Sequence, residues 1–259
     1  MLDDIYKLMD ALKLRHVRAV VAESLKSAQK DKPSYSAFLV ELLRREHEGQ
    51  RNRATAGRLR RSGLREFWTL DTFPFHIQKG VNKRMIYELA ELDFIARGES
   101  LVFIGQAAVG KSGLASAILL KALYAGHRGL AIRAQDLFEA MRASHADRTT
   151  RAFFHRLSRL DVLLVDEFGY LNTPDPQQFN DFFRLMDDRC NRKSTIITTN
   201  LGFDEWGKFL GNGPLVAALL SRLLQKCRTI TFPKDAVNLR NQKLRLPTTA
   251  PKPTILNAE

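Results

Sequence analysis

The chain has 259 residues, 44% of them hydrophobic, which suffices for one α/β domain and a smaller appendage. No stretch approaches the roughly 20 unbroken apolar residues of a membrane helix, and Cys190 and Cys227 lie far apart outside any CxxC spacing, so we exclude membrane and disulfide-rich secreted classes and expect a cytoplasmic protein. Lys and Arg outnumber Asp and Glu by 41 to 28, a net charge of +13, which indicates either a polyanionic partner or a basic, solvated surface.

The first 66 residues predict a small all-α N-terminal domain with a basic arm. Apolar residues at helical spacing predict two short helices within residues 1–30. Pro33 then breaks the pattern, and Ser34 or Ser36 is placed to cap a third helix. We expect the buried face of that helix to include Phe38, Leu39, Leu42 and Leu43.

Eight arginines crowd the end of this region. They are Arg44, Arg45, Arg51, Arg53, Arg58, Arg60, Arg61 and Arg65. One interpretation is an arm that binds DNA phosphates, with Arg51, Arg53, Arg58, Arg60 and Arg61 as its contacts. The other is a solvated helix face with some pairing to Glu46 and Glu48.

Residues 67–80 predict an apolar linker that lies on the next domain, where aromatic side chains either pack or flank a purine ring. From 81 to 246, short apolar segments alternate with helical patterns, which predicts an α/β fold with a five-stranded parallel sheet flanked by helices. The buried strands are expected at 101–104, 129–132, 162–165, 195–199 and 229–232. The tail 247–259 has three prolines and no periodicity, and we expect it to be disordered.

A phosphate-binding motif follows the first of these strands. It reads Gly105-Gln106-Ala107-Ala108-Val109-Gly110-Lys111-Ser112 and matches G-x-x-x-x-G-K-[ST] between a strand and a helix-forming run. In such a P-loop, backbone N–H groups and the helix dipole hold the phosphates. Lys111 is predicted to bridge the β- and γ-phosphates of ATP, and Ser112 to bind Mg²⁺.

Two acids end the strand 162–165. Asp166 and Glu167 arrive at the edge where α/β sheets bind ligands. After a P-loop strand, Asp166 is expected to orient Mg²⁺ and Glu167 to take a proton from the attacking water. The alternative is a plain solvated turn.

Three further segments are more specific than the P-loop. Val165–Leu171, Ile197–Gly207 and Leu220–Leu224 resemble the IstB-like ATP-binding proteins, AAA+ ATPases that assist insertion-sequence transposases and are relatives of the helicase loader DnaC and the initiator DnaA. The resemblance covers residues 36–240 and implies an AAA+ P-loop fold with ATP hydrolysis.

The resemblance also implies roles for residues outside the P-loop. In AAA+ proteins the strand ending at Asn200 lies between the P-loop strand and the acidic strand, so Asn200 is expected to sense the γ-phosphate, although a turn-forming Asn remains the alternative. Arg222 matches the arginine finger that reaches a neighbouring subunit's ATP, and Arg240 lies where a second sensing arginine is found. The chain departs from the family pattern at Ser221, usually Asp, and at Ser112, usually Thr.

The resulting prediction is a homo-oligomer that assembles with ATP on duplex DNA and assists the transposase of the same element. A DnaC-like helicase loader and a small-molecule P-loop kinase are the alternatives. The six histidines show no metal-ligand spacing, and no acidic triad of a transposase can be assembled. Strand cutting is therefore assigned to a partner.

Overall fold

The computed structural model describes residues 2–170, 173–211 and 213–241. They divide into two compact units, with the division between Gly57 and Arg58. The sequence placed this boundary at residue 66, but residues 58–66 are bonded to the second unit. Arg58 Nε donates to the carbonyl of Leu123 at 2.9 Å, and the carbonyl of Ser62 accepts from Ala131 N–H at 2.6 Å. The expected disordered tail at 247–259 lies outside the described residues.

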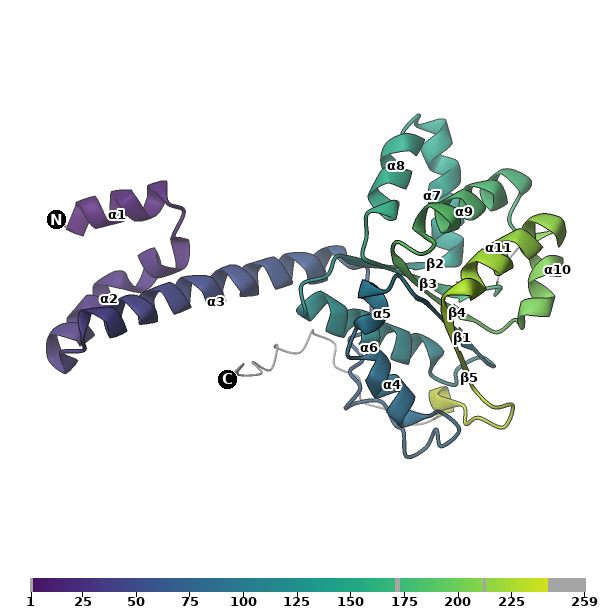
Figure 1. Ribbon diagram of the computed structural model, residues 1–259, viewed down its shortest axis with the longest axis horizontal. Coiled ribbons are helices and arrows are strands. Elements are labelled where there is room, and N and C mark those ends of the chain that lie inside the picture. The colour runs from purple at the N-terminus through teal and green to yellow at the C-terminus, as the bar shows by residue number, and fades with distance from the viewer. Residues whose placement is uncertain (1, 171–172, 212, 242–259) are drawn as a thin grey trace. The chain divides into compact units, whose positions relative to one another are not determined.

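The first unit is helical, as predicted. Its helices are α1 (Leu2–Ala11), α2 (Arg15–Asp31) and the larger part of α3 (Tyr35–Arg61), labelled in Figure 1. Val17, Val21 and Leu42 form its small core, with Phe38 packed against it. Ser34 caps α3 by accepting from Ala37 N–H at 3.2 Å.

Two expected core positions of α3 were wrong. Leu39 and Leu43 are 55% and 54% exposed, whereas Phe38 and Leu42 contact the core. Residues four apart share one helix face, and their immediate successors are rotated by about 100° from it. Only one of the two apolar stripes can therefore face the three-helix core.

A buried carboxylate fixes the start of α2. Glu46 is only 4% exposed, and its Oε2 accepts from the N–H groups of His16 and Val17 at 2.8 and 2.9 Å, while Gln50 Nε2 donates to its other oxygen at 3.0 Å. Burial alone raises the pKa of Glu46, but these hydrogen bonds outweigh it and bring the pKa below the ordinary value. Glu46 is thus a helix cap, and the expected pairing with neighbouring arginines is not its role.

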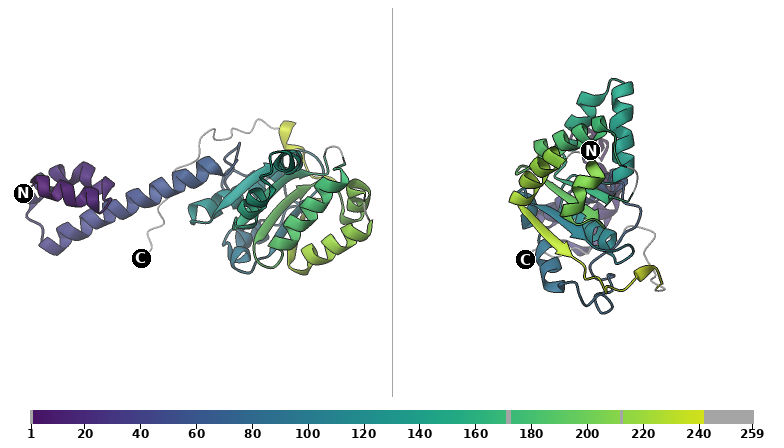
Figure 2. Two further views of the ribbon diagram at one scale, coloured as in Figure 1. Left: turned by 90° about the horizontal axis from the view of Figure 1, so that it is seen from above. Right: turned by 90° about the vertical axis from the view of Figure 1, so that its right-hand side faces the viewer.

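The second unit is an α/β sandwich, visible from two further sides in Figure 2. Its strands are β1 (Ser100–Ile104), β2 (Gly129–Arg133), β3 (Val162–Phe168), β4 (Ser194–Thr199) and β5 (Cys227–Thr231). Its helices are α4 (Lys83–Leu89), α5 (Asp93–Ala96), α6 (Lys111–Tyr124), α7 (Ala134–Ala146), α8 (Thr150–Ser158), α9 (Pro176–Arg189), α10 (Trp206–Leu210) and α11 (Gly213–Gln225), with short 3₁₀ turns at Phe203–Glu205 and Leu239–Asn241. Among the described residues, no helix is both long and apolar enough to span a membrane.

The five strands form one parallel sheet in the order β2-β3-β4-β1-β5. This confirms the predicted sheet and places β4 between the P-loop strand and the acidic strand. Alternate side chains enter two cores: Leu101 and Phe103 pack with α4 and α6, and Val102 packs on the opposite face with α7, α9 and α11. β2 differs from the expected buried strand, because it lies at the sheet edge and is half-buried.

The apolar linker packs onto this unit through Trp68 and Phe73, which are 8% and 4% exposed. Gln78, buried at 1%, joins two distant segments: its Nε2 donates to the carbonyl of Val109 at 2.8 Å, and its Oε1 accepts from Val237 N–H at 3.2 Å. A single side chain therefore holds the P-loop, the linker and the C-terminal segment together.

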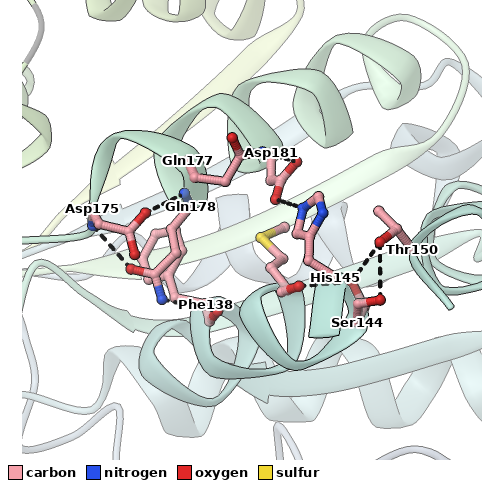
Figure 3. A network of polar contacts seen from close by, with 9 residues as sticks. Phe138, Ser144, His145, Thr150, Asp175, Gln177, Gln178 and Asp181 are labelled. Atoms are coloured by element: carbon pink, nitrogen blue, oxygen red, sulfur yellow. Dashed lines mark hydrogen bonds and ion pairs between the residues drawn. The ribbon is translucent and has the colours of Figure 1, made fainter. Parts of the chain in front are cut away.

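Polar contacts join α7 to α9 (Figure 3). His145 Nε2 lies 2.6 Å from Asp181 Oδ2, and Gln178 Nε2 donates to the carbonyl of Phe138 at 3.0 Å. Gln178 also completes a capping box with Asp175 at the start of α9. Because α7 begins directly after β2, these contacts fix the helix beside the end of that strand.

Candidate nucleotide-binding site

A cavity of about 690 Å³ opens at the carboxyl edge of the sheet. The P-loop and the ends of β2, β3 and β4 contribute Lys111, Arg133, Asp166 and Thr198 to its wall. The wall is completed by residues 63–66, by Trp68 and by Leu239 and Arg240. This is the edge at which open α/β sheets bind ligands, and the cavity is large enough for a nucleotide.

The P-loop backbone has the shape that phosphate binding needs. Ala108 and Gly110 adopt left-handed conformations with φ of 62° and 103°, an alternation that turns successive N–H groups into an anion-binding nest. A Cβ at Gly110 would lie 2.8 Å from Phe73 Cε2, so this position accepts only glycine. Leu239 N–H fastens the loop by donating to the carbonyl of Ala108 at 2.8 Å.

Lys111 lies inside the loop with 5% of its surface exposed. Its Nζ donates to the carbonyls of Gly105 and Gln106 at 2.7 and 2.6 Å and to the hydroxyl of Tyr170 at 3.3 Å. Burial lowers the pKa of Lys111 to about 8, although the carboxylates of Asp166 and Glu167 raise it in part. The ammonium is thus a concentrated, poorly hydrated charge suited to phosphate oxygens.

The two expected Mg²⁺ ligands lie together. Ser112 Oγ donates to Asp166 Oδ1 at 2.7 Å, and the hydroxyl of Thr198 donates to the same oxygen. A hydroxyl and a carboxylate are oxygen ligands of the kind Mg²⁺ prefers, and this ion completes its shell with waters and phosphates. No group of three or more His, Cys, Asp or Glu side chains in the described part of the chain could hold a metal by itself.

Glu167 adopts an unusual backbone conformation, with φ of 59°. The β3–β4 register shifts between Val165 and Phe168, and the N–H of Glu167 donates to Thr198 Oγ1 at 3.0 Å. Arg133 pairs with the carboxylate, its Nε lying 3.2 Å from Oε2. A carboxylate held at a strained position on a cavity wall is suited to proton transfer.

Asn200 is exposed and is not part of the cavity wall, whereas Thr198, two residues earlier, is. Alternation along β4 accounts for this, because residues two apart in a strand share one face and β4 ends at Thr199. The hydroxyl of Thr198 contacts both Asp166 and the Glu167 backbone. The residue of β4 that contacts both acids is therefore Thr198.

Arg222 lies on α11, away from the cavity wall. Its Nη1 forms an ion pair with Asp187 of α9, and its guanidinium lies 5.4 Å from the ring centroid of Phe183. The side chain is 44% exposed. Arg240, by contrast, lines the cavity.

Comparison of the amino-acid sequence with known proteins identifies the family of this chain. The model of the IstB-like ATP-binding proteins matches residues 7–245. The ATP-binding protein of insertion sequence IS21 from Pseudomonas aeruginosa is 33% identical over 236 residues, 91% of this chain and 89% of that protein. The chain belongs to the IstB-like ATP-binding proteins. The counterpart of insertion sequence IS5376 from Geobacillus stearothermophilus is 32% identical over 212 residues, 82% and 84% of the two chains.

Solved structures show the same fold. The DnaC helicase loader aligns with a TM-score of 0.53 at 23% identity, covering 64% of this IstB-like chain and 96% of the loader. AMPPCP-bound DnaA from Aquifex aeolicus aligns with a TM-score of 0.51 at 21% identity, covering 63% of this chain and 50% of the DnaA chain. Both likenesses are of fold, and they confirm the predicted α/β fold with its five-stranded parallel sheet flanked by helices. The resemblance found in the sequence is thereby confirmed, and with it the ATP-binding character of the family.

The arginines expected to contact DNA differ in their surroundings. Arg51, Arg53, Arg60 and Arg61 are exposed, and none of them has a hydrogen bond or ion pair to another side chain within the described ranges. Arg58 is half-buried and bonded to Leu123. Arg58 therefore belongs to the packing of the ATPase unit, and its guanidinium is less available for a DNA contact than the four exposed ones.

Sequence reasoning missed other charged residues of this IstB-like chain. Arg133 was unnoticed because an arginine at the end of an edge strand belongs to no sequence motif. A second basic surface lies on α7, α8 and the residues next to them, where five arginines are exposed: Arg142, Arg148, Arg151, Arg156 and Arg159. The signal for it was present, since residues 148–160 contain four arginines and no acid.

Proposed function

We propose that this protein is an ATPase that assembles with ATP on duplex DNA and assists the transposase of its insertion sequence. The observation that carries the proposal is the combination of a complete P-loop site with exposed, unpaired arginines on α3, in a family of insertion-sequence ATP-binding proteins. The likeness to the DnaC loader supports the fold alone, so a helicase-loading role is not preferred.

In the proposed reaction the terminal phosphate of ATP faces Lys111, and Glu167 accepts the proton of the attacking water. Lys111 binds the phosphates by charge, and its burial strengthens that interaction. Mg²⁺ held by Ser112 and Asp166 would neutralise phosphate charge. Thr198 keeps the two acids in place through its contacts with Asp166 and the Glu167 backbone. The Arg133 ion pair holds the Glu167 carboxylate aside until it engages water.

Arg222 is proposed to act on the ATP of a neighbouring subunit. It lies outside the wall of its own cavity, and a partly exposed guanidinium on a helix end is accessible to a second copy. A charge that arrives only on assembly makes hydrolysis depend on oligomerisation. Asn200, exposed directly after the end of β4, is proposed to sense the γ-phosphate of the bound ATP.

DNA binding is proposed to be electrostatic and indifferent to sequence. Arg51, Arg53, Arg60 and Arg61 supply the contacts on α3, and the five exposed arginines between residues 142 and 159 supply a second surface. Arginine forms bidentate contacts with phosphate, and several weak contacts in one assembly act as a multivalent grip. ATP contributes by closing the subunit interfaces that align these surfaces.

The proposal is tested by fluorescence anisotropy of a labelled duplex at increasing salt, with and without a non-hydrolysable ATP analogue. Each phosphate contact contributes about −0.9 to the slope of log K against log salt. The double variant Arg51→Gln, Arg53→Gln should flatten this slope, while the control Arg84→Gln, Lys121→Gln should leave it unchanged. This control removes two exposed cations of the ATPase unit that pair with glutamates.

Two outcomes would refute the proposal. Wild-type protein with the ATP analogue could fail to bind any duplex at low salt, or it could bind one short sequence far more tightly than all others. A stable complex with a helicase in the absence of DNA binding would favour the loader function instead.

A further inference from the structure

Tyr170 stands over the phosphate-binding lysine. Its hydroxyl lies 3.3 Å from Lys111 Nζ, and Nζ is 5.6 Å from the centroid of its ring. Tyr170 lines the nucleotide cavity and is 37% exposed. Neither the P-loop motif nor the acidic pair assigns it a role, although it follows Glu167 by only three residues.

A fixed turn delivers Tyr170 to this place. Gly169 has φ of 89°, and a Cβ there would lie 2.4 Å from Leu201 Cδ1, so the turn depends on glycine. Tyr170 N–H closes it by donating to the carbonyl of Glu167 at 3.3 Å. Tyr170 is thus placed by the same backbone turn that follows Glu167.

Burial, together with the nearby carboxylates, keeps the hydroxyl of Tyr170 protonated by raising its pKa. Burial and then the carboxylate of Glu167 raise the pKa of Tyr170, while Arg240 lowers it and Asp166 raises it further. A protonated phenol both accepts and donates. Its oxygen accepts from Lys111, which leaves its own proton to be donated to another acceptor.

The side of the ammonium on which Tyr170 lies identifies that acceptor. Lys111 contacts Gly105 and Gln106 of the loop, and it is the loop that cradles the inner phosphates. Tyr170 approaches from the turn after β3, the strand that carries Asp166 and Glu167, and these acids face the terminal phosphate in a P-loop ATPase. The hydroxyl is therefore on the γ-phosphate side of the lysine.

We propose that Tyr170 donates a hydrogen bond to the γ-phosphate and thereby makes this site bind ATP more tightly than ADP. The inference rests on the proposed function in one respect, namely that ATP binds with its phosphates in this P-loop. It adds a ligand that contacts only the triphosphate, at a position that couples the turn after β3 to the nucleotide.

The test is the variant Tyr170→Phe, which keeps the ring over Lys111 and removes only the hydroxyl. Affinities for a non-hydrolysable ATP analogue and for ADP are measured by competition against a fluorescent nucleotide, with Mg²⁺ present. The affinity for the analogue should fall about tenfold, as expected for losing a hydrogen bond to a charged group, and that for ADP should change by less than about twofold. Tyr87→Phe on α4 is the control, because Tyr87 is also 37% exposed and lies outside the cavity wall.

Each outcome decides the question. An equal loss of affinity for the ATP analogue and for ADP in Tyr170→Phe would mean that the hydroxyl only supports Lys111. No loss of affinity for either nucleotide would mean that the hydroxyl does not contact the phosphates. Either result overturns the inference and leaves the proposed ATP site in place. If the wild-type protein bound neither nucleotide, the proposed ATP site would fail and the inference with it. A melting temperature like that of the wild type confirms that the variant is folded.

Discussion

Removing the Glu46 carboxylate should destabilise the N-terminal unit and spare the ATPase unit. In Glu46→Ala, the N–H groups of His16 and Val17 lose their acceptor. A buried unsatisfied donor costs about 1–3 kcal/mol, and because His16 N–H is only partly buried, we expect about 2–4 kcal/mol in total. For a domain of this size, that corresponds to a fall in melting temperature of roughly 10–25 °C.

The two tryptophans make this measurable within the whole chain. Trp68 and Trp206 are its only tryptophans, and both lie beyond Arg58, in the second unit. Circular dichroism of Glu46→Ala should therefore show an early loss of helix that tryptophan fluorescence does not follow. ATP affinity should be unchanged below the second transition, and DNA affinity should fall. The reasoning is refuted if both signals keep their wild-type midpoints, or if they shift together.

The same carboxylate predicts a dependence on pH. The folded pKa of Glu46 is below the ordinary 4.5, so the carboxylate stabilises the first unit above the unfolded pKa, and this contribution is lost as the pH falls through the lower folded value. In the wild type, the stability of the first unit should therefore fall as the pH is lowered. In Glu46→Gln, the part of this fall that comes from protonating Glu46 should disappear. An acid transition of unchanged size in this variant would assign the effect to other carboxyl groups.

Three substitutions test the ATP site. Lys111→Ala should abolish tight nucleotide binding in a fluorescence titration, because the backbone N–H groups cannot replace the buried charge; near-wild-type affinity would contradict the phosphate assignment. Glu167→Gln should still bind ATP while steady-state hydrolysis falls on the order of 10²–10⁴-fold, and undiminished turnover would move the base role elsewhere. Arg222→Ala should bind nucleotide normally and lose hydrolysis only in the assembled state, and mixing it with Lys111→Ala should restore part of the activity. Unimpaired hydrolysis by Arg222→Ala alone, with no effect of mixing, would rule out action in trans.

Short sequence patterns predicted the sheet and the phosphate-binding site well. The five strands were recognisable because buried parallel strands are continuous apolar runs, and the P-loop because its glycines, lysine and hydroxyl are contiguous in the chain. Ser112 and Asp166, which are 54 positions apart, were predicted to meet since both follow parallel strands of one sheet, and they lie 2.7 Å apart.

The environment of a side chain was predicted less well where it depends on a contact with a residue far away in the sequence. Whether Arg58 is exposed depends on the carbonyl of Leu123, and the function of Glu46 depends on the start of α2; neither contact has a local signature. The contact of Thr198 with both acids depends on which face of β4 meets β3, and the register shift at Glu167 cannot be derived from composition.

Electron microscopy of the protein with ATP and a plain duplex tests the central claim most directly. The expected images show regular arrays of several subunits along the DNA with ATP, and isolated particles with ADP or with the Lys111→Ala variant. Subunits that remain single on the DNA with ATP, or arrays that form equally well without nucleotide, would contradict ATP-dependent assembly on duplex DNA.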